Sequence, residues 1–520
     1  MSLARTVARN SLWSGLDMLV DLVFPPLASI VVARAMGPAK LGSFSFVMWL
    51  AMTMTALGST GLSSAARKYM ADYAGKQRPD VVRALIRACF GAQLFVLSIL
   101  TLAGLAWALW AMPADERLFA SLAVIAVLPG GIMSMATSVN NAFEEVRPNV
   151  VASVSSALVQ AAGMVATVVM GWGLVGLAAA HLASRTCDCL VRWKLTTARL
   201  SGYLKGLGAD PTPPGANPKL PAGLGRDLMF FVAESTILTL LTLVVWNRSE
   251  MIFLKRYSAI EQVAYFSVAF GLSLIPGQMV GPFSRAAAVS VYAECGRDAQ
   301  AGLRVAQGYW RYAVLLVLPA CFGLAVLSGP LLRLLYGIRY LDATPVLLLG
   351  ASLSMFGPLA NPATALVTAS GGQRRLVIAG VCAAIATLTL DYFLVRAHAA
   401  MGGALANGLG QAISTITVIL IARRYSFTVS LAFLLRAVCA AAGMAALVAT
   451  AVHFLPDLVA IAVGMPVGVF AYGALLRVGR VVDGKDVERL LEAESLLPKL
   501  LRPLFRRLLR AVASSNARAS

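Results

Sequence analysis

Long apolar segments alternate with short polar connectors along almost the whole 520-residue chain. Most apolar segments run to about 20 residues, the length that a helix needs to cross a hydrocarbon core about 30 Å thick. A helix is expected for each segment because lipid offers no hydrogen-bond partners to the backbone. About fourteen spans are predicted: 11–33, 41–64, 88–112, 119–141, 150–171, 174–191, 227–247, 263–283, 312–332, 344–368, 377–395, 401–421, 437–454 and 458–476.

The composition of the chain indicates a membrane protein, and the placement of its basic residues predicts how the protein is oriented across the membrane. The chain is 59% hydrophobic and 13% charged, whereas soluble chains are about one quarter charged, so an all-α polytopic membrane protein is predicted. With both termini in the cytoplasm, 35 of the 44 Lys and Arg residues fall on the cytoplasmic side and 9 on the other. This bias follows the positive-inside rule. We therefore attribute the net charge of +20 to the orientation of the chain in the membrane and to attraction to anionic lipid. No nucleic-acid partner is expected.

A Gly- and Pro-rich connector that begins at Ser201 separates two halves that repeat each other. "VVARAMGPAKLGSFSF" aligns with "FLKRYSAIEQVAYFSV" at an offset of 222 residues, which places Arg34 over Arg256. A second match at an offset of 227 places Gly176 over Gly403. Because each repeat holds six spans, the sequence predicts two six-helix lobes related by a pseudo-two-fold axis along the membrane normal.

The repeat and the connector define the expected domains. They are an N-terminal lobe (1–200), a cytoplasmic linker (201–223), a C-terminal lobe (224–425), two extra helices (426–478) and a basic tail (479–520). In the tail, "KLLRPLFRRLLRAV" gathers leucines on one stripe, which is typical of an interfacial helix. A basic segment that only adds to the positive-inside bias is the alternative.

Three stretches resemble the polysaccharide-biosynthesis flippases of the multidrug/oligosaccharidyl-lipid/polysaccharide exporter superfamily. They are "VVARAMGPAKLGSFSF", "VGPFSRAAAVS" and "LTLDYFLVRAHAAMGGALA". The resemblance implies a transporter rather than an enzyme, located in the bacterial inner membrane. It would move undecaprenyl-diphosphate-linked oligosaccharide from the cytoplasmic to the periplasmic leaflet for O-antigen, capsule or exopolysaccharide synthesis. The partners implied are this substrate, membrane lipids and a polysaccharide polymerase with its chain-length machinery.

Charged residues inside predicted spans are candidate site residues because they are expensive to place in lipid. Asp17 and Asp21 share one helix face, where they could take up H⁺ or Na⁺ or pair with basic groups. Arg67 and Arg285 occupy nearly equivalent places in the two repeats, and the guanidinium group suits a diphosphate. Positive-inside anchoring is the alternative for both arginines. We expect the two to face one central cavity.

Two further acidic residues, Glu234 and Asp391, also lie within predicted spans. Glu234 is a candidate for lining the substrate cavity. Asp391 could line the cavity as well, or it could have a packing or capping role. Arg248 and Glu250 are expected to form a local ion pair at the outer edge. The seven cysteines have no disulfide or metal spacing, and we predict no metal site and no cofactor, with coupling to H⁺ or Na⁺ left open.

Two other functions compete with the flippase. A cation-coupled multidrug exporter of the same superfamily would prefer an apolar cavity lined with acidic residues, whereas the paired arginines favour an anionic substrate. A polysaccharide polymerase or ligase would need a large loop outside the membrane to hold the reacting sugars. The longest outer connector, 248–262, is too short for that role.

Overall fold

The computed structural model describes residues 3–206, 220–221 and 223–481, and for residues 3–26, 28, 201, 205 and 206 only the backbone is described. The predicted interfacial helix in the tail lies outside this part of the chain. Helices make up nearly all of the described residues, which contain no β-strand. The all-α prediction is therefore confirmed for the described part of the chain.

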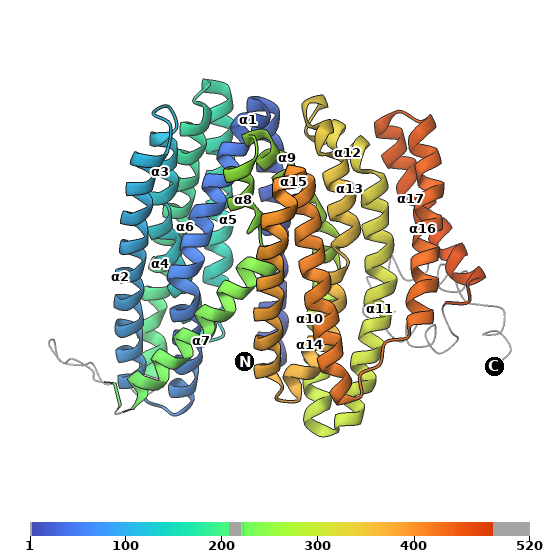
Figure 1. The fold of residues 1–520 in the computed structure, drawn as a ribbon. Helices are drawn as coiled ribbons and strands as arrows, with labels where there is room; N and C mark the ends of the chain where they lie inside the picture. Colours follow the sequence, from blue (N-terminus) through green and yellow to red (C-terminus); the bar gives the residue numbers. More distant parts are fainter. Residues whose placement is uncertain (1–2, 207–219, 222, 482–520) are drawn as a thin grey trace. The chain divides into compact units, whose positions relative to one another are not determined.

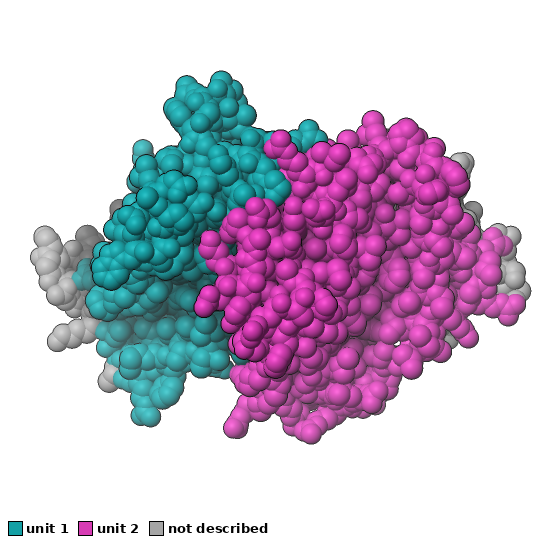
Figure 2. Space-filling model, turned by 45° about the horizontal axis from the view of Figure 1, so that its top comes forward, with its two compact units in different colours: residues 1–248 teal, residues 249–520 magenta. Residues whose placement is uncertain are grey.

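The chain divides into two compact units, which Figure 2 colours teal and magenta. Unit 1 comprises Met1–Arg248 and unit 2 comprises Ser249–Ser520. The helices of unit 1 are α1 (Leu3–Gly75), α2 (Pro79–Ala111), α3 (Arg117–Ile125), α4 (Val127–Ala142), α5 (Arg147–Met170), α6 (Gly173–Gly206) and α7 (Leu224–Val245). Sequence reasoning assigned α7 to the second lobe, and in the structure it packs against α1 within unit 1.

Unit 2 contains more and shorter helices (Figure 1). They are α8 (Glu250–Tyr257), α9 (Ile260–Ser273), α10 (Ile275–Arg297), α11 (Ala299–Val326), α12 (Ser328–Leu335), η1 (Ile338–Ala343), α13 (Thr344–Leu353), α14 (Phe356–Ala369), α15 (Gln373–Ala422), η2 (Arg423–Tyr425), α16 (Leu431–Phe454) and α17 (Asp457–Val478). The pair α16–α17, which has no counterpart in the first half of the sequence, packs against α11 and α12.

Twelve helical stretches among the described residues are long and apolar enough to cross a membrane. Predicted spans 11–33 and 41–64 both fall in α1, and 377–395 and 401–421 both fall in α15. Each of these two helices is broken inside, at Gly37 (φ 80°, ψ 176°) and at Ala399 (φ 47°, ψ −126°). The chain is a multi-pass membrane protein; the first of the twelve stretches begins at Ser29, so most of the predicted span 11–33 lies outside the residues that this count covers.

The break at Gly37 has a counterpart in unit 2. An offset of 222 residues carries Gly37 onto Ala259, and there the chain leaves the helical conformation between α8 and α9. In unit 1 the positive φ requires glycine, whereas Ala259 adopts an extended φ of −66° that any residue tolerates. Both units thus have a break where the sequence repeat aligns them, which supports the repeat, and the axis between the lobes stays a prediction.

Each unit has its own apolar core. In unit 1, Met70, Leu85, Cys89 and Met135 are fully buried between α1, α2 and α4. In unit 2, a large cluster gathers around Tyr309 and Trp310 of α11 and includes residues of α14, α15, α16 and α17. These cores hold the helices that carry the buried polar groups described next.

Candidate functional site

The six predicted site residues fall into different environments. Arg67 in α1, Glu234 in α7 and Arg285 in α10 are exposed, whereas Asp391 in α15 is fully buried. Asp17 and Asp21 lie in α1, where only the backbone is described. Of the six residues, Asp391 is the one that belongs to a buried polar cluster within the described residues.

We call this group the carboxylate cluster of unit 2: Ser249, Glu250, Asp391, Asn407 and Gln411. All five side chains are buried, and Glu250 and Asp391 have no exposed surface. The Ser249 hydroxyl donates to Oδ2 of Asp391 over 3.1 Å, and the Asn407 amide donates to Oε1 of Glu250 over 2.9 Å. The Gln411 amide in turn donates to Oδ1 of Asn407 over 2.8 Å.

Three helical segments bring these side chains together. Ser249 and Glu250 come from the start of α8, Asp391 from the first half of α15, and Asn407 and Gln411 from its second half, after the break at Ala399. Gly403 lets α15 approach α8 closely, because a Cβ there would lie 3.3 Å from the Phe266 ring and 3.4 Å from Cβ of Glu250. The hairpin of α15 therefore builds the cluster.

Two carboxylate oxygens in the carboxylate cluster, Oδ1 of Asp391 and Oε2 of Glu250, are buried without a hydrogen-bond donor among the described residues. A buried carboxylate oxygen without a donor is unfavourable unless it is protonated or meets a cation. Carboxylate and amide oxygens are ligands of hard cations, so the cluster has the chemistry for a proton or a small metal cation.

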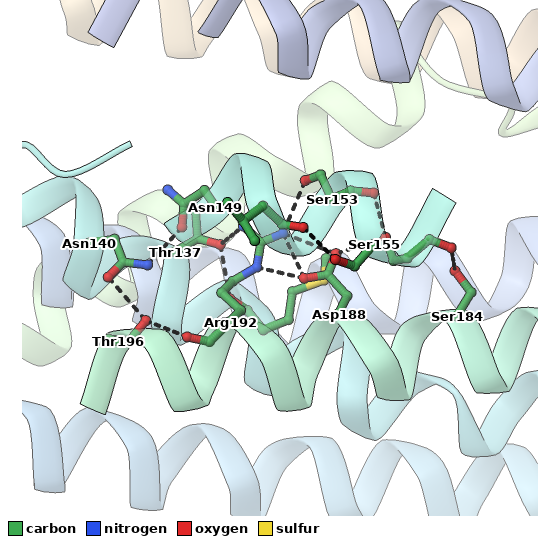
Figure 3. Close-up of polar contacts among 12 residues, drawn as sticks. Thr137, Asn140, Asn149, Ser153, Ser155, Ser184, Asp188, Arg192 and Thr196 are labelled. Atoms are coloured by element: carbon green, nitrogen blue, oxygen red, sulfur yellow. Dashed lines mark hydrogen bonds and ion pairs between the residues drawn. The ribbon is translucent and has the colours of Figure 1, made fainter. Parts of the chain in front are cut away.

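A second buried charged group lies in unit 1, and we call it the ion-pair network: Thr137, Ser153, Ser156, Asp188 and Arg192 (Figure 3). Arg192 binds Asp188 through two nitrogens, with Nε at 2.7 Å from Oδ1 and Nη2 at 3.0 Å from Oδ2. Both side chains are only 5% exposed. Nη1 of the guanidinium group also donates to Thr137 Oγ1 over 3.0 Å, and Nη2 donates to Ser153 Oγ over 3.2 Å.

This network links α4, α5 and α6 and leaves no charge unpaired. Ser156 adds a long hydrogen bond of 3.4 Å to Oδ2 of Asp188, so both carboxylate oxygens have donors. Next to it, Asn140 donates to Asn149 over 2.8 Å and accepts from Thr196 over 3.0 Å. Because its charges are satisfied, we assign the ion-pair network to the architecture of unit 1 and not to ligand binding.

Sequence reasoning missed most of both groups. Glu250 was expected at an outer edge and is fully buried, and Asn407 and Gln411 were not singled out. The available signal was the spacing of Asn407 and Gln411, two amides four residues apart in an apolar segment. Asp188 and Arg192 give the same signal with opposite charges. No group of three or more His, Cys, Asp or Glu side chains that could hold a metal was found within the described ranges.

Solved structures of transporters share this fold. The lipid II flippase MurJ in an inward closed conformation superposes with a TM-score of 0.70 at 12% identity, covering 91% of this chain and 98% of MurJ. An inward-facing multidrug resistance MATE transporter gives 0.59 at 16% identity, covering 80% and 98%. A MOP superfamily transporter from Pyrococcus furiosus gives 0.56 at 16%, covering 81% and 95%. At these identities the likeness defines the fold.

The fold is therefore one that a solved lipid flippase and solved multidrug transporters share. The sequence pattern of the polysaccharide biosynthesis protein family matches residues 7–294, more than half of the chain, so the chain belongs to this family. No curated protein matches the sequence. The resemblance inferred from the three sequence stretches is confirmed.

Proposed function

We propose that the protein is a flippase that moves undecaprenyl-diphosphate-linked oligosaccharide across the inner membrane for the synthesis of a surface polysaccharide. The observation that carries this proposal is the family match over residues 7–294 on a fold shared with a lipid II flippase. Transport by this route needs no covalent chemistry on the sugar, which suits a chain built of apolar helices. Both termini are proposed to be cytoplasmic, as the distribution of Lys and Arg predicts.

The multidrug exporter is the alternative within the same fold. The match to MurJ covers 91% of the chain. The part that it leaves uncovered is therefore shorter than α16, α17 and residues 482–520 taken together. The match to the MATE transporter covers 80%, which is low enough to leave all of them outside. The greater coverage and the higher TM-score support a lipid-linked substrate over a drug.

The exposed arginines are proposed to contact the substrate. Arg67 and Arg285 each present a guanidinium group at the surface of their own helix, and such groups bind a diphosphate through paired hydrogen bonds. Asp17, Asp21 and Glu234 remain candidates for the same transport path. A polysaccharide polymerase and its chain-length machinery are the partners that would use the translocated units.

The carboxylate cluster of unit 2 is the proposed site of the coupling ion, H⁺ or Na⁺. Asp391 supplies a buried oxygen that has no donor among the described residues, and in the same cluster Glu250 accepts from Asn407, whose own amide oxygen accepts from Gln411. Binding of a cation there would neutralise buried negative charge and so favour whichever conformation closes around it. The cluster of residues is observed in the structure, whereas the coupling of ion binding to transport is proposed.

Reconstitution tests the function directly. The full chain is placed in proteoliposomes with an undecaprenyl-diphosphate oligosaccharide that carries a fluorophore, and a membrane-impermeant quencher reports the inner and outer pools. We expect the protein to exchange the pools faster than protein-free vesicles do. The same vesicles are tested for ethidium transport, and ethidium movement without lipid exchange would overturn the flippase in favour of the exporter.

A further inference from the structure

Four arginines gather at one end of unit 2, and we call them the arginine patch: Arg374, Arg375, Arg423 and Arg424. All four are exposed. Because α15 folds back on itself at Ala399, its first and last turns lie at the same end (Figure 1). A hydrogen bond of 2.9 Å from Arg375 Nη1 to the Tyr425 hydroxyl joins these two ends directly.

The arginine patch lacks the anionic partners that other arginines of unit 2 have. Arg297 pairs with Glu294 at 3.3 Å, and Arg304 lies 3.8 Å from Asp298. None of the four patch arginines forms an ion pair with a carboxylate of residues 27–206 or 223–481, the part of the chain whose acidic side chains are described. Four positive charges held close together without counter-charges favour an anionic ligand from outside the chain.

Exposed apolar stripes lead away from the patch on both halves of α15. On the first half, Arg374 is followed at helical spacing by Ile378, Val381, Ile385 and Leu388, all of which are exposed. On the second half, exposed Ile413, Ile416 and Leu420 precede Arg424 at the same spacing. Each stripe thus runs from lipid-facing apolar surface to a guanidinium group at the end of the helix.

We propose that the arginine patch and the two stripes bind an anionic phospholipid of the surrounding membrane, with its phosphates on the arginines and its acyl chains on the stripes. Guanidinium groups bind phosphate through two parallel hydrogen bonds, so four arginines can serve two phosphates. Two separate stripes suit a lipid with several chains better than a polyprenyl carrier with one. Diphosphatidylglycerol has both properties, and basic pockets between membrane helices commonly take such head groups.

The test compares two double variants of the full chain, purified in detergent and titrated with diphosphatidylglycerol under native mass spectrometry. R374Q/R424Q removes one arginine from each end of α15 next to an apolar stripe. R297Q/R304Q is the matched control, because it lowers the net charge by the same amount in unit 2 and affects arginines that already have carboxylates. We expect the first variant to bind at least about tenfold more weakly, and the control to bind like the unaltered chain.

Other lipids separate the possible occupants. Phosphatidylethanolamine should bind both variants equally, and undecaprenyl diphosphate should be unaffected by R374Q/R424Q. Equal loss in the two double variants would mean that only net charge matters and would overturn the proposal. Loss of undecaprenyl diphosphate with diphosphatidylglycerol retained would assign the patch to the substrate and also overturn it. If R374Q/R424Q fails to fold, R374K/R424K keeps the charge, and an unchanged affinity there would count against phosphate recognition by the guanidinium groups.

Discussion

The two units bury charge in different ways. In unit 1, Asp188 and Arg192 form an ion pair to which side chains of α4 and α5 add further hydrogen bonds. In unit 2, Glu250 and Asp391 are both acidic, and Oδ1 of Asp391 has no donor within the described residues. A buried carboxylate oxygen that accepts no hydrogen bond indicates a ligand site, whereas a buried ion pair whose charges are balanced indicates a structural role.

The two groups also differ in how the chain assembles them. Asp188 and Arg192 are four residues apart on α6, so helix formation alone brings them together. Ser249 and Asp391 are 142 residues apart, and Glu250 and Asn407 are 157 apart. The carboxylate cluster therefore exists only when α8 and both halves of α15 are packed. A site of this kind responds to rearrangement of those helices, whereas the Asp188–Arg192 pair lies within one helix and does not depend on it.

The largest expected effect comes from breaking the ion-pair network on one side. Arg192→Met leaves the Asp188 carboxylate buried without its partner, which should lower the free energy of unfolding by about 3–5 kcal/mol. Thermal unfolding of the purified full chain measures the loss. The double variant D188L/R192M removes both charges and should regain most of the stability. A single variant as stable as the unaltered chain would show that the pair does not hold unit 1 together.

Next in size is the effect of the exposed arginines on transport, one in each unit. If Arg67 and Arg285 each donate charge-assisted hydrogen bonds to the diphosphate, each alanine variant should lose about 1.5–3 kcal/mol of binding, or about ten- to hundredfold in rate. Lysine at either position should rescue only part of the rate because the planar fork is lost. Translocation of lipid-linked oligosaccharide by proteoliposomes is the measurement.

Lys76→Ala is the control for both arginines, since Lys76 is an exposed residue of the same charge whose partner is Asp72, at 3.7 Å. It should leave the rate unchanged. Normal transport in both arginine variants would show that these residues only anchor their helices. Loss in one variant alone would assign substrate recognition to one unit.

A smaller effect is expected from Asp391→Asn, which tests the carboxylate cluster. The amide has the same shape as the carboxylate and can still accept from Ser249, so the fold should keep its stability. Stimulation of transport by a gradient of Na⁺ or H⁺ should fall by about tenfold, because the charge that draws the cation is gone. Asp457→Asn, which alters a partly buried carboxylate outside the cluster, paired with Arg333 at 3.1 Å, should not change it. Full ion dependence in D391N would exclude the cluster as the coupling site.

The helices were predictable because a membrane imposes one length and one polarity on every span. Gly37 and the polar segment before Gly403 marked the two hairpins at which α1 and α15 break. The break between α3 and α4, which divides the span predicted at 119–141, was not predicted, since no Pro, Gly or charged residue stands at Ala126. The local sequence pattern therefore predicted where the spans lie, but not where a helix breaks within a span.

The candidate site was predictable only in part. Asp391 stood out because an acid inside an apolar span needs an explanation. Glu250 did not, since Arg248 and Lys255 beside it suggested an ordinary helix end. Asn407 and Gln411 are uncharged, and their role depends on α8, which lies about 150 residues earlier in the chain. Contacts between segments so far apart are set by packing and leave no periodic trace in the sequence.

The smallest effect concerns a turn that the two units build differently. The 227-residue offset that aligns Gly176 with Gly403 also aligns Trp172 with Ala399. In unit 1 the turn between α5 and α6 places glycines on either side, Gly171 (φ 69°) and Gly173 (φ 61°). In unit 2 the hairpin of α15 places Ala399 itself at φ 47° and ψ −126°, a conformation that alanine rarely adopts.

Ala399→Gly should therefore raise the free energy of unfolding by about 1 kcal/mol, since relief of about 1–3 kcal/mol of backbone strain exceeds the added entropy of the unfolded glycine. Ala397→Gly is the matched control, because it makes the same substitution two residues earlier in the helical, exposed part of α15. There glycine should lower stability by about 1 kcal/mol. Thermal unfolding of the two variants should thus shift in opposite directions. If both variants unfold earlier than the unaltered chain, Ala399 is not strained, and the alanine turn of unit 2 is as well suited to its hairpin as the glycine turn of unit 1.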